Sequence, residues 1–308
     1  MPSWIPERPN YKKEHRTVGF MVLAAFLLLF LCRFLAPYLP IPDLPFLLPL
    51  LLLGVALLLP ALVYILFRGK GYTKAMRLQL PRAAHTPLLI AAFFALFSGT
   101  LLLSILFGGT ETLGNCVAAF DAERPQTVWE TLLLLLVTAL LPAVLEELFF
   151  RGVVMVEYER RGAVRAILMS ALLFALLRFD LSNLPAYLFA GALLALVLFV
   201  TNSLFATVIL HVLYNLAATL TQHYLNTLYY FTGTVQLFLF VFILILLISL
   251  ILFCRAAARV YRGRDEQGIG DPRRAVPYNV QFYTVLDAVS DPAILLCVGI
   301  AIAGFILL

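Results

Sequence analysis

Apolar stretches long enough to cross a lipid bilayer recur along almost the whole chain. A membrane-spanning helix needs roughly 20 predominantly apolar residues, and the stretches at residues 44–67, 126–150 and 233–254 each exceed that length. Hydrophobic residues make up 63% of the 308 residues, charged residues make up only 13%, and the mean hydropathy is +0.98. These values exclude a water-soluble globule and a disordered chain. The sequence therefore predicts an all-α polytopic integral membrane protein.

We expect about nine transmembrane helices, with eight as the alternative because the fifth and sixth are short. The apolar run of the first helix is too long for the core of a signal peptide, so we expect it to be retained as a span. The nine candidates cover residues 17–38, 44–67, 87–107, 126–150, 163–178, 184–200, 203–222, 233–254 and 287–308.

The Lys and Arg residues fall in alternate loops when these helices are followed from a cytoplasmic N-terminus. All but three of the 22 cations lie in segments that this arrangement places in the cytoplasm or, for Arg165, at the cytoplasmic start of a span. Arg124 falls in an outside loop, and Arg33 and Arg178 fall within spans. Because cytoplasmic loops carry an excess of Lys and Arg, the pattern predicts a cytoplasmic N-terminus and an outside C-terminus. The net charge of +5 then reflects topology, so we expect membrane lipids and no nucleic acid among the partners.

The predicted organisation is a cytoplasmic N-terminal segment at residues 1–16 followed by a single membrane domain at 17–308. Within that domain, residues 255–286 are basic and contain several Gly and Pro, which predicts a cytoplasmic linker. The four cysteines stand far apart in the sequence. Neither a disulfide framework nor a cysteine metal site is therefore expected.

Ionisable side chains within the spans are the most informative residues, because each must be paired, hydrated or functional to offset its cost in hydrocarbon. Arg33 and Glu130 lie near the outer ends of their spans, where they can reach water or pair with each other. We expect these two to be structural. The complete set is Arg33, Glu130, Glu146, Glu147, Arg178 and His211.

Two adjacent carboxylates, Glu146 and Glu147, lie near the end of the fourth span. Glu147 and Arg151 are four residues apart with the acid first, which favours an ion pair on one face of a helix. Glu146 is rotated by about 100° onto another face. It is therefore available to take a proton from water or to bind a metal. The alternative interpretation is a paired helix end at the cytoplasmic interface.

His211 and Asn215 are also four residues apart, in the sequence HVLYN of the seventh span. An imidazole and a carboxamide on one helical face can together donate hydrogen bonds to an oxyanion. Alternatively, the imidazole can bind a metal, or it can be a hydrogen-bonded packing residue. If the fourth and seventh spans meet, Glu146 provides a base for hydrolysis, and His211 with Asn215 provides an oxyanion clamp.

These residues resemble the signature of the CAAX prenyl protease type II and bacteriocin-processing family of membrane-embedded proteins, also called CPBP or Abi. That signature has Glu-Glu-x-x-x-Arg, then Phe-x-x-x-His, then His-x-x-x-Asn on successive helices of an all-helical core. Glu146 to Arg151 match the first motif and His211 to Asn215 match the third. The similarity covers a core of about residues 125–220.

The second motif departs from the family pattern at one position. Its only candidate is Phe174 to Arg178, where the expected histidine is arginine. The resemblance implies Glu146 as the base, Arg151 as the structural partner of Glu147, and His211 with Asn215 as the oxyanion clamp. Arg178 cannot bind a metal or accept a proton, because its guanidinium stays protonated. It can instead pair with Glu146 and make that carboxylate a poorer base.

The resemblance implies an intramembrane endopeptidase that cleaves a membrane-associated peptide with water activated by Glu146. One alternative is an inactive family member, a pseudoenzyme that acts as a membrane scaffold or immunity partner. Another is an active enzyme in which Arg178 acts as the electrophile. A transporter with a charge relay is a third class. Zinc is a candidate cofactor by resemblance only, with Glu146 and His211 as ligands, and the loss of the second-motif histidine weakens it. We expect a multi-pass protein of a bacterial cell membrane.

Overall fold

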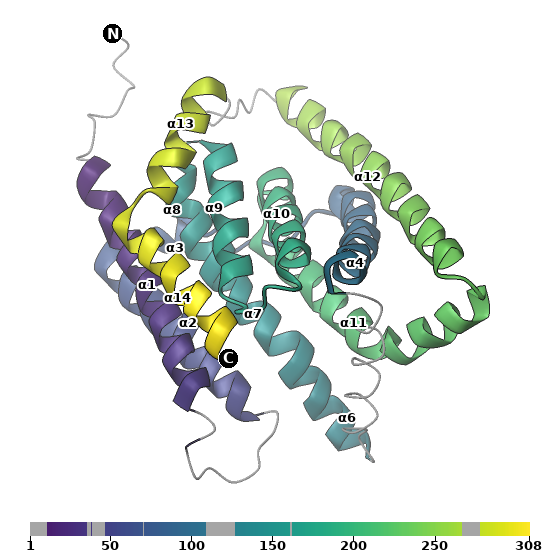
Figure 1. The fold of residues 1–308 in the computed structure, drawn as a ribbon. Helices are drawn as coiled ribbons and strands as arrows, with labels where there is room; N and C mark the ends of the chain where they lie inside the picture. Colours follow the sequence, from purple (N-terminus) through teal and green to yellow (C-terminus); the bar gives the residue numbers. More distant parts are fainter. Residues whose placement is uncertain are drawn as a thin grey trace.

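A computed structural model describes residues 11–35, 38, 47–69, 71–108, 127–160, 162–266 and 278–308 of the chain. In these residues every regular element is helical (Figure 1). The first half contains α1 (Tyr11–Leu35), α2 (Leu47–Arg68), α3 (Tyr72–Ala75), the 3-10 helix η2 (Ala83–His85), α4 (Thr86–Gly108), α6 (Val128–Leu135), the π-helix η3 (Leu136–Leu140), α7 (Leu141–Glu147), the π-helix η4 (Leu148–Val154) and α8 (Met155–Glu159). The second half contains α9 (Ala163–Leu176), α10 (Leu184–Thr201), α11 (Leu204–Thr232), α12 (Val235–Glu266), α13 (Tyr278–Val289) and α14 (Pro292–Leu307).

The all-α polytopic class predicted from the sequence is confirmed, and each of the nine candidate regions contains a helix. Among the described residues, six helices are long and apolar enough to cross a membrane. The helices α13 and α14, bent by 62°, provide a seventh if they form one span. The two remaining candidates of the nine, α9 and the apolar part of α11, are shorter apolar helices. At 1.5 Å per residue, a helix of 14 residues such as α9 reaches roughly 21 Å, less than the ~30 Å hydrocarbon core.

The segment from α6 to α8 forms one long helix that runs diagonally through the molecule (Figure 1). Two π-helical stretches interrupt it, η3 directly before α7 and η4 directly after it. Pro142 is the second residue of α7 and cannot donate an amide hydrogen to the preceding turn, which favours a wider turn there. Both π-helical stretches flank Glu146 and Glu147, so they set the directions in which these side chains point.

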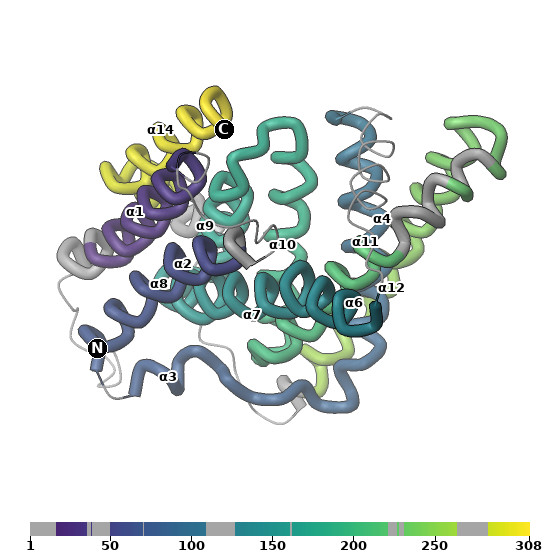
Figure 2. Tube along the Cα trace, turned by 90° about the horizontal axis from the view of Figure 1, so that it is seen from below, coloured from purple at the N-terminus to yellow at the C-terminus, as the bar shows by residue number. Residues whose placement is uncertain are grey.

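Helices from both halves of the chain surround this long helix. Seen from below, α1 and α14 lie together on one side, and α4, α11 and α12 lie on the other (Figure 2). Between them α9 packs against α10 at very short range, because a Cβ atom on Gly191 would lie 2.8 Å from the Cα atom of Ala171. The absence of a side chain at Gly191 thus allows the two backbones to approach.

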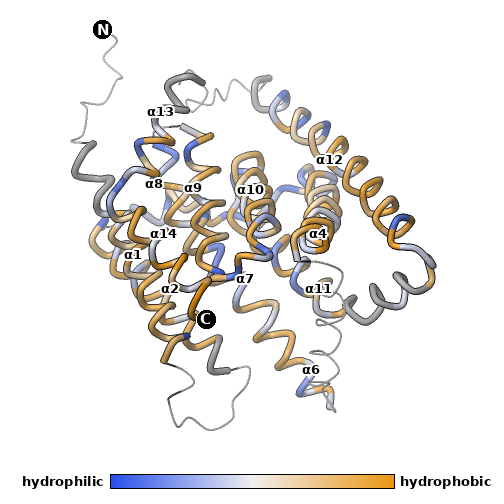
Figure 3. The backbone as a smooth tube through the Cα atoms, viewed as in Figure 1, coloured by the Kyte–Doolittle hydropathy of each residue, from blue (hydrophilic) through white to orange (hydrophobic). Residues whose placement is uncertain are grey.

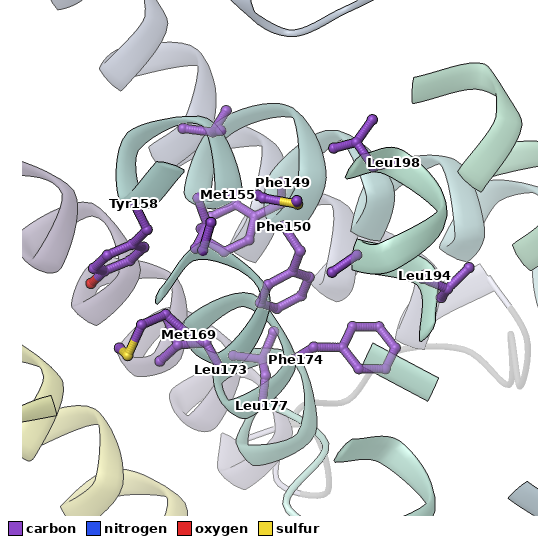
Figure 4. Close-up of a cluster of buried hydrophobic side chains, with 14 of the residues drawn as sticks. Phe149, Phe150, Met155, Tyr158, Met169, Leu173, Phe174, Leu177, Leu194 and Leu198 are labelled. Atoms are coloured by element: carbon purple, nitrogen blue, oxygen red, sulfur yellow. The ribbon is translucent and has the colours of Figure 1, made fainter. Parts of the chain in front are cut away.

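Aromatic side chains contribute to a cluster of buried hydrophobic residues (Figure 4). The ring centroids of Phe149 and Phe150 are 5.0 Å apart, and those of Phe150 and Phe174 are 5.4 Å apart, both in edge-to-face geometry. This geometry is the favoured one for aromatic pairs. Most of the remaining chain is apolar, with hydrophilic positions near α7 inside it (Figure 3).

The segments predicted to be cytoplasmic meet at one end of the molecule. Arg68, at the end of α2, lies 2.5 Å from the carboxylate of Glu157 in α8, and Arg77, just after α3, forms an ion pair with Glu159. Tyr72 packs in the same region, where burial raises the pKa of its phenol. The predicted linker 255–286 is largely helical where it is described, since α12 continues to Glu266 and α13 begins at Tyr278.

Candidate active site

Glu146 and Glu147 are the last two residues of α7 and both side chains are buried. Their side chains point in different directions because successive residues of a helix are about 100° apart. Glu147 faces Arg151 and His211, whereas Glu146 faces Arg178. The two carboxylates therefore have separate partners within one site.

The ion pair predicted from the spacing of Glu147 and Arg151 is present, with 3.0 Å between Oε1 and Nη1. Both side chains are completely buried. Arg151 also donates through Nη2 to the carbonyl of Gly191 in α10, at 3.0 Å, and its guanidinium lies 4.8 Å from the ring centroid of Phe174. A buried charge needs such a partner and further hydrogen bonds to be tolerated. This pair fixes η4 against α9 and α10.

His211 joins the two carboxylates. Its Nδ1 lies 2.8 Å from Oε1 of Glu147, and its Nε2 lies 3.8 Å from Oε2 of Glu146. Glu147 is ionised because it is the partner of Arg151, and an ionised carboxylate only accepts hydrogen bonds. We therefore assign the ring hydrogen of a neutral His211 to Nδ1 from its partner. The Nε2 lone pair then faces Glu146.

Arg178 lies in the turn that follows α9 and donates from Nη2 to Oε2 of Glu146 at 2.6 Å. The guanidinium is held beside two rings, 5.0 Å from the centroid of Phe174 and 5.4 Å from that of Tyr187. The side chain of Arg178 is 31% exposed, whereas that of Glu146 is 4% exposed. This is the pairing that the departure in the second motif predicted.

The turn that carries Arg178 is fixed by residues outside the predicted family core. Arg33 of α1 donates to the backbone carbonyl of Arg178 at 3.0 Å. The next residue, Phe179, has a left-handed backbone conformation with φ of 52°, which is costly for a bulky residue. Its ring packs edge-to-face against Phe26 and Phe30 of α1, with centroids 6.2 Å away in both pairs. These contacts hold the turn in place.

The contacts of Asn215 and Glu130 in the structure differ from those that the sequence predicted. Asn215 donates from Nδ2 to the carbonyl of Ala139 in η3 at 3.3 Å, and the ring hydrogen of His211 is directed to Glu147. The two groups therefore do not converge on one point as an oxyanion clamp in this conformation. Glu130 does not pair with Arg33; it accepts from the backbone of Thr127 and caps α6.

Sequence reasoning missed the contributions of Tyr187, Gly191 and Phe179 to the site. Asp180 was also missed; it accepts hydrogen bonds from Asn183 at 2.9 Å and from Tyr187 at 3.3 Å, and so shapes the turn after Arg178. Asp180 and Asn183, three residues apart between two helices, were a local signal for such a turn. The packing of Tyr187 and Phe179 had no local signal.

The side chains present do not fit a zinc site. Zinc in a catalytic site takes three protein ligands, and in the described part of the chain no group of three His, Cys, Asp or Glu residues is close enough to hold a metal ion. Glu146 and His211 supply two donor atoms, and the cationic Arg178 lies against the same carboxylate oxygen. A second cation at that oxygen would be repelled.

The fold and the site together define a polytopic membrane protein with a buried cluster of two carboxylates, an imidazole and two guanidinium groups. Residues 128–217 match a protein family described as Type II CAAX prenyl endopeptidase Rce1-like. The resemblance that the first and third motifs predicted is confirmed for this part of the chain. No curated protein and no solved structure matched the chain.

Proposed function

We propose that this protein is a membrane-embedded endopeptidase that hydrolyses a peptide bond of a membrane-associated peptide. The observation that carries the proposal is that Glu146 and His211, which belong to separate motifs, lie 3.8 Å apart in one buried site. Both lie in the segment that matches a family of endopeptidases. In the route implied by the family resemblance, Glu146 takes a proton from the attacking water.

A second candidate function is that of a non-catalytic membrane scaffold or immunity partner. It is favoured by one specific observation, the 2.6 Å contact between Arg178 and Glu146. A charge-assisted hydrogen bond of this length occupies the carboxylate oxygen that would otherwise contact water. In this function the ion pair replaces the catalytic centre.

The experiment that separates the two functions is peptide cleavage by purified protein in lipid nanodiscs. The substrates are membrane-anchored peptides of varied sequence, and the proteins are the wild type, Glu146→Ala and Arg178→His. Cleavage by the wild type and loss of activity in Glu146→Ala support the endopeptidase. An inert wild type with cleavage by Arg178→His supports the non-catalytic function, because restoring the histidine would restore the site.

We further propose a bacterial cell membrane as the location, with the N-terminus in the cytoplasm and substrate entering from the cytoplasmic half of the bilayer. The support is the distribution of Lys and Arg along the chain and the meeting of Arg68 and Arg77 with α8 at one end of the molecule. Membrane lipids and a membrane-associated peptide or protein are the expected partners. Many transporters are built from internal repeats. We recognise no such repeat in this sequence, which weakens the hypothesis of a transporter with a charge relay.

A further inference from the structure

The hydrogen bonds of His211 distinguish its two ring nitrogens. Nδ1 is 2.8 Å from Glu147, which Arg151 keeps ionised. Nε2 lies 3.8 Å from Oε2 of Glu146, too far for a hydrogen bond, and no residue in the described part of the chain donates to it. A neutral imidazole with its hydrogen on Nδ1 has its basic lone pair on Nε2. His211 therefore has the properties of a base that is oriented by a carboxylate.

Glu146 has the opposite properties in the same site. Its Oε2 accepts a hydrogen bond from Arg178 at 2.6 Å, so protonation of this oxygen would disrupt a charge-assisted bond. Arg178 retains further N–H donors, since a guanidinium has five, and its side chain is the more exposed member of the pair. The pair therefore presents hydrogen-bond donors, whereas Nε2 of His211 has a basic lone pair and accepts no hydrogen bond from a guanidinium in the described part of the chain.

From these contacts, and resting on the proposed endopeptidase function, we infer that His211 takes the proton from water in this protein. Glu147 is the positioning residue that orients the ring and stabilises its charged form. Glu146 positions Arg178, whose guanidinium stabilises the oxyanion. This division of roles follows the logic of a carboxylate, an imidazole and an oxyanion donor, with an arginine as the donor.

The reaction balances with these groups alone. Nε2 takes one proton from water while the water oxygen bonds to the scissile carbonyl carbon, and the carbonyl electron pair moves onto its oxygen. The resulting oxyanion accepts hydrogen bonds from Arg178. The oxyanion electron pair then re-forms the carbonyl as the carbon–nitrogen bond breaks, and the imidazolium gives its proton to the amide nitrogen. The products are a carboxylic acid, which ionises, and an amine, and His211 is neutral again.

Two isosteric variants test this inference by the size of their effects. Glu146→Gln retains an oxygen that accepts from Arg178, whereas His211→Gln removes the base. We expect His211→Gln to lower kcat by at least about 100-fold, the usual contribution of a general base. This loss in kcat should be at least ten times larger than the loss in Glu146→Gln. His223→Gln, further along the same helix α11, is the matched control. A loss in Glu146→Gln that equals or exceeds the loss in His211→Gln overturns the inference while the endopeptidase function stands.

A second measurement does not depend on turnover. In protein labelled with 15N histidine, the His211 signals are those absent from the spectrum of His211→Gln. We expect a neutral ring with hydrogen on Nδ1, and a change in this tautomer population in Glu147→Gln, whose amide can donate as well as accept. A ring with hydrogen on Nε2 overturns the inference. Absence of peptide cleavage by the wild type would instead refute the proposed function, and the tautomer would still be measured.

Discussion

Nη2 of Arg178 lies 2.6 Å from Oε2 of Glu146, across 32 residues of sequence. The arginine occupies the position at which the family resemblance leads us to expect a histidine, and it contacts the carboxylate that the same resemblance implies as the base. Its backbone carbonyl accepts a hydrogen bond from Arg33, and its ring neighbours hold the guanidinium from two directions. Arg178 is therefore held by specific contacts, and this makes its function the central question.

Replacing Arg178 with alanine tests its role as the oxyanion donor. We expect kcat to fall about 10²- to 10³-fold, the usual effect of removing one such donor, with a smaller change in KM. Arg178→Lys should restore part of the activity, because an ammonium group keeps the charge but not the fork of donors. Steady-state kinetics on one membrane-anchored peptide provides the measurement. Higher activity in Arg178→Ala than in the wild type would show that the ion pair inhibits the site.

Chelators provide the test of metal dependence. Because Arg178 lies against the carboxylate of Glu146 and only His211 adds a second donor beside it, we expect cleavage rates to be unchanged within twofold after treatment with EDTA or 1,10-phenanthroline. Zinc added afterwards should not increase the rate. Complete loss of activity that is restored by zinc would contradict the absence of a metal site.

The buried pair of Glu147 and Arg151 should dominate the stability of this region. Arg151→Met leaves a buried carboxylate without its partner, and breaking such a pair costs about 3–5 kcal/mol. The double variant Glu147→Gln/Arg151→Met should recover part of this loss, since neither charge then remains. Denaturant unfolding in mixed micelles measures both, with Arg262→Gln, which is exposed on α12, as the control. Equal stability of Arg151→Met and the wild type would show that the pair contributes nothing.

The close packing of α9 and α10 depends on a single missing side chain. In Gly191→Ala the added Cβ would lie 2.8 Å from Cα of Ala171, and overpacking of this kind costs about 1–3 kcal/mol. Gly299 of α14 is the matched control, because no atom lies within 4 Å of a Cβ placed there, so Gly299→Ala should be neutral or slightly stabilising. Thermal unfolding in detergent compares the two variants. A smaller effect in Gly191→Ala than in Gly299→Ala would mean that α9 and α10 can separate without cost.

Local spacing predicted the parts of the site that lie on one helix, whereas the meeting of the helices that carry the motifs was a condition that the sequence left open. The Glu147–Arg151 pair follows from a four-residue separation, and the pairing of Arg178 with Glu146 followed from the position of the arginine in the second motif. The hydrogen bond of Asn215 to η3 could not be predicted, because a π-helical turn changes the helical register near Ala139. Hydropathy also did not reveal that α9 is only 14 residues long and that most of its residues are buried against other helices.

The orientation of the chain in the membrane is the remaining prediction, and a pair of single-cysteine variants tests it. Lys74 and Val128 are both exposed and lie on either side of α4 in sequence. Because Lys74 belongs to a basic segment next to the ion pairs of α8, we expect it to be cytoplasmic, and one crossing by α4 then places Val128 outside. In a background without the native cysteines, a membrane-impermeant maleimide should label Val128→Cys in intact cells. It should label Lys74→Cys only after the membrane is opened. Labelling of both from the same side would mean that α4 does not cross, and reversed labelling would mean that the charge distribution does not set the topology of this chain.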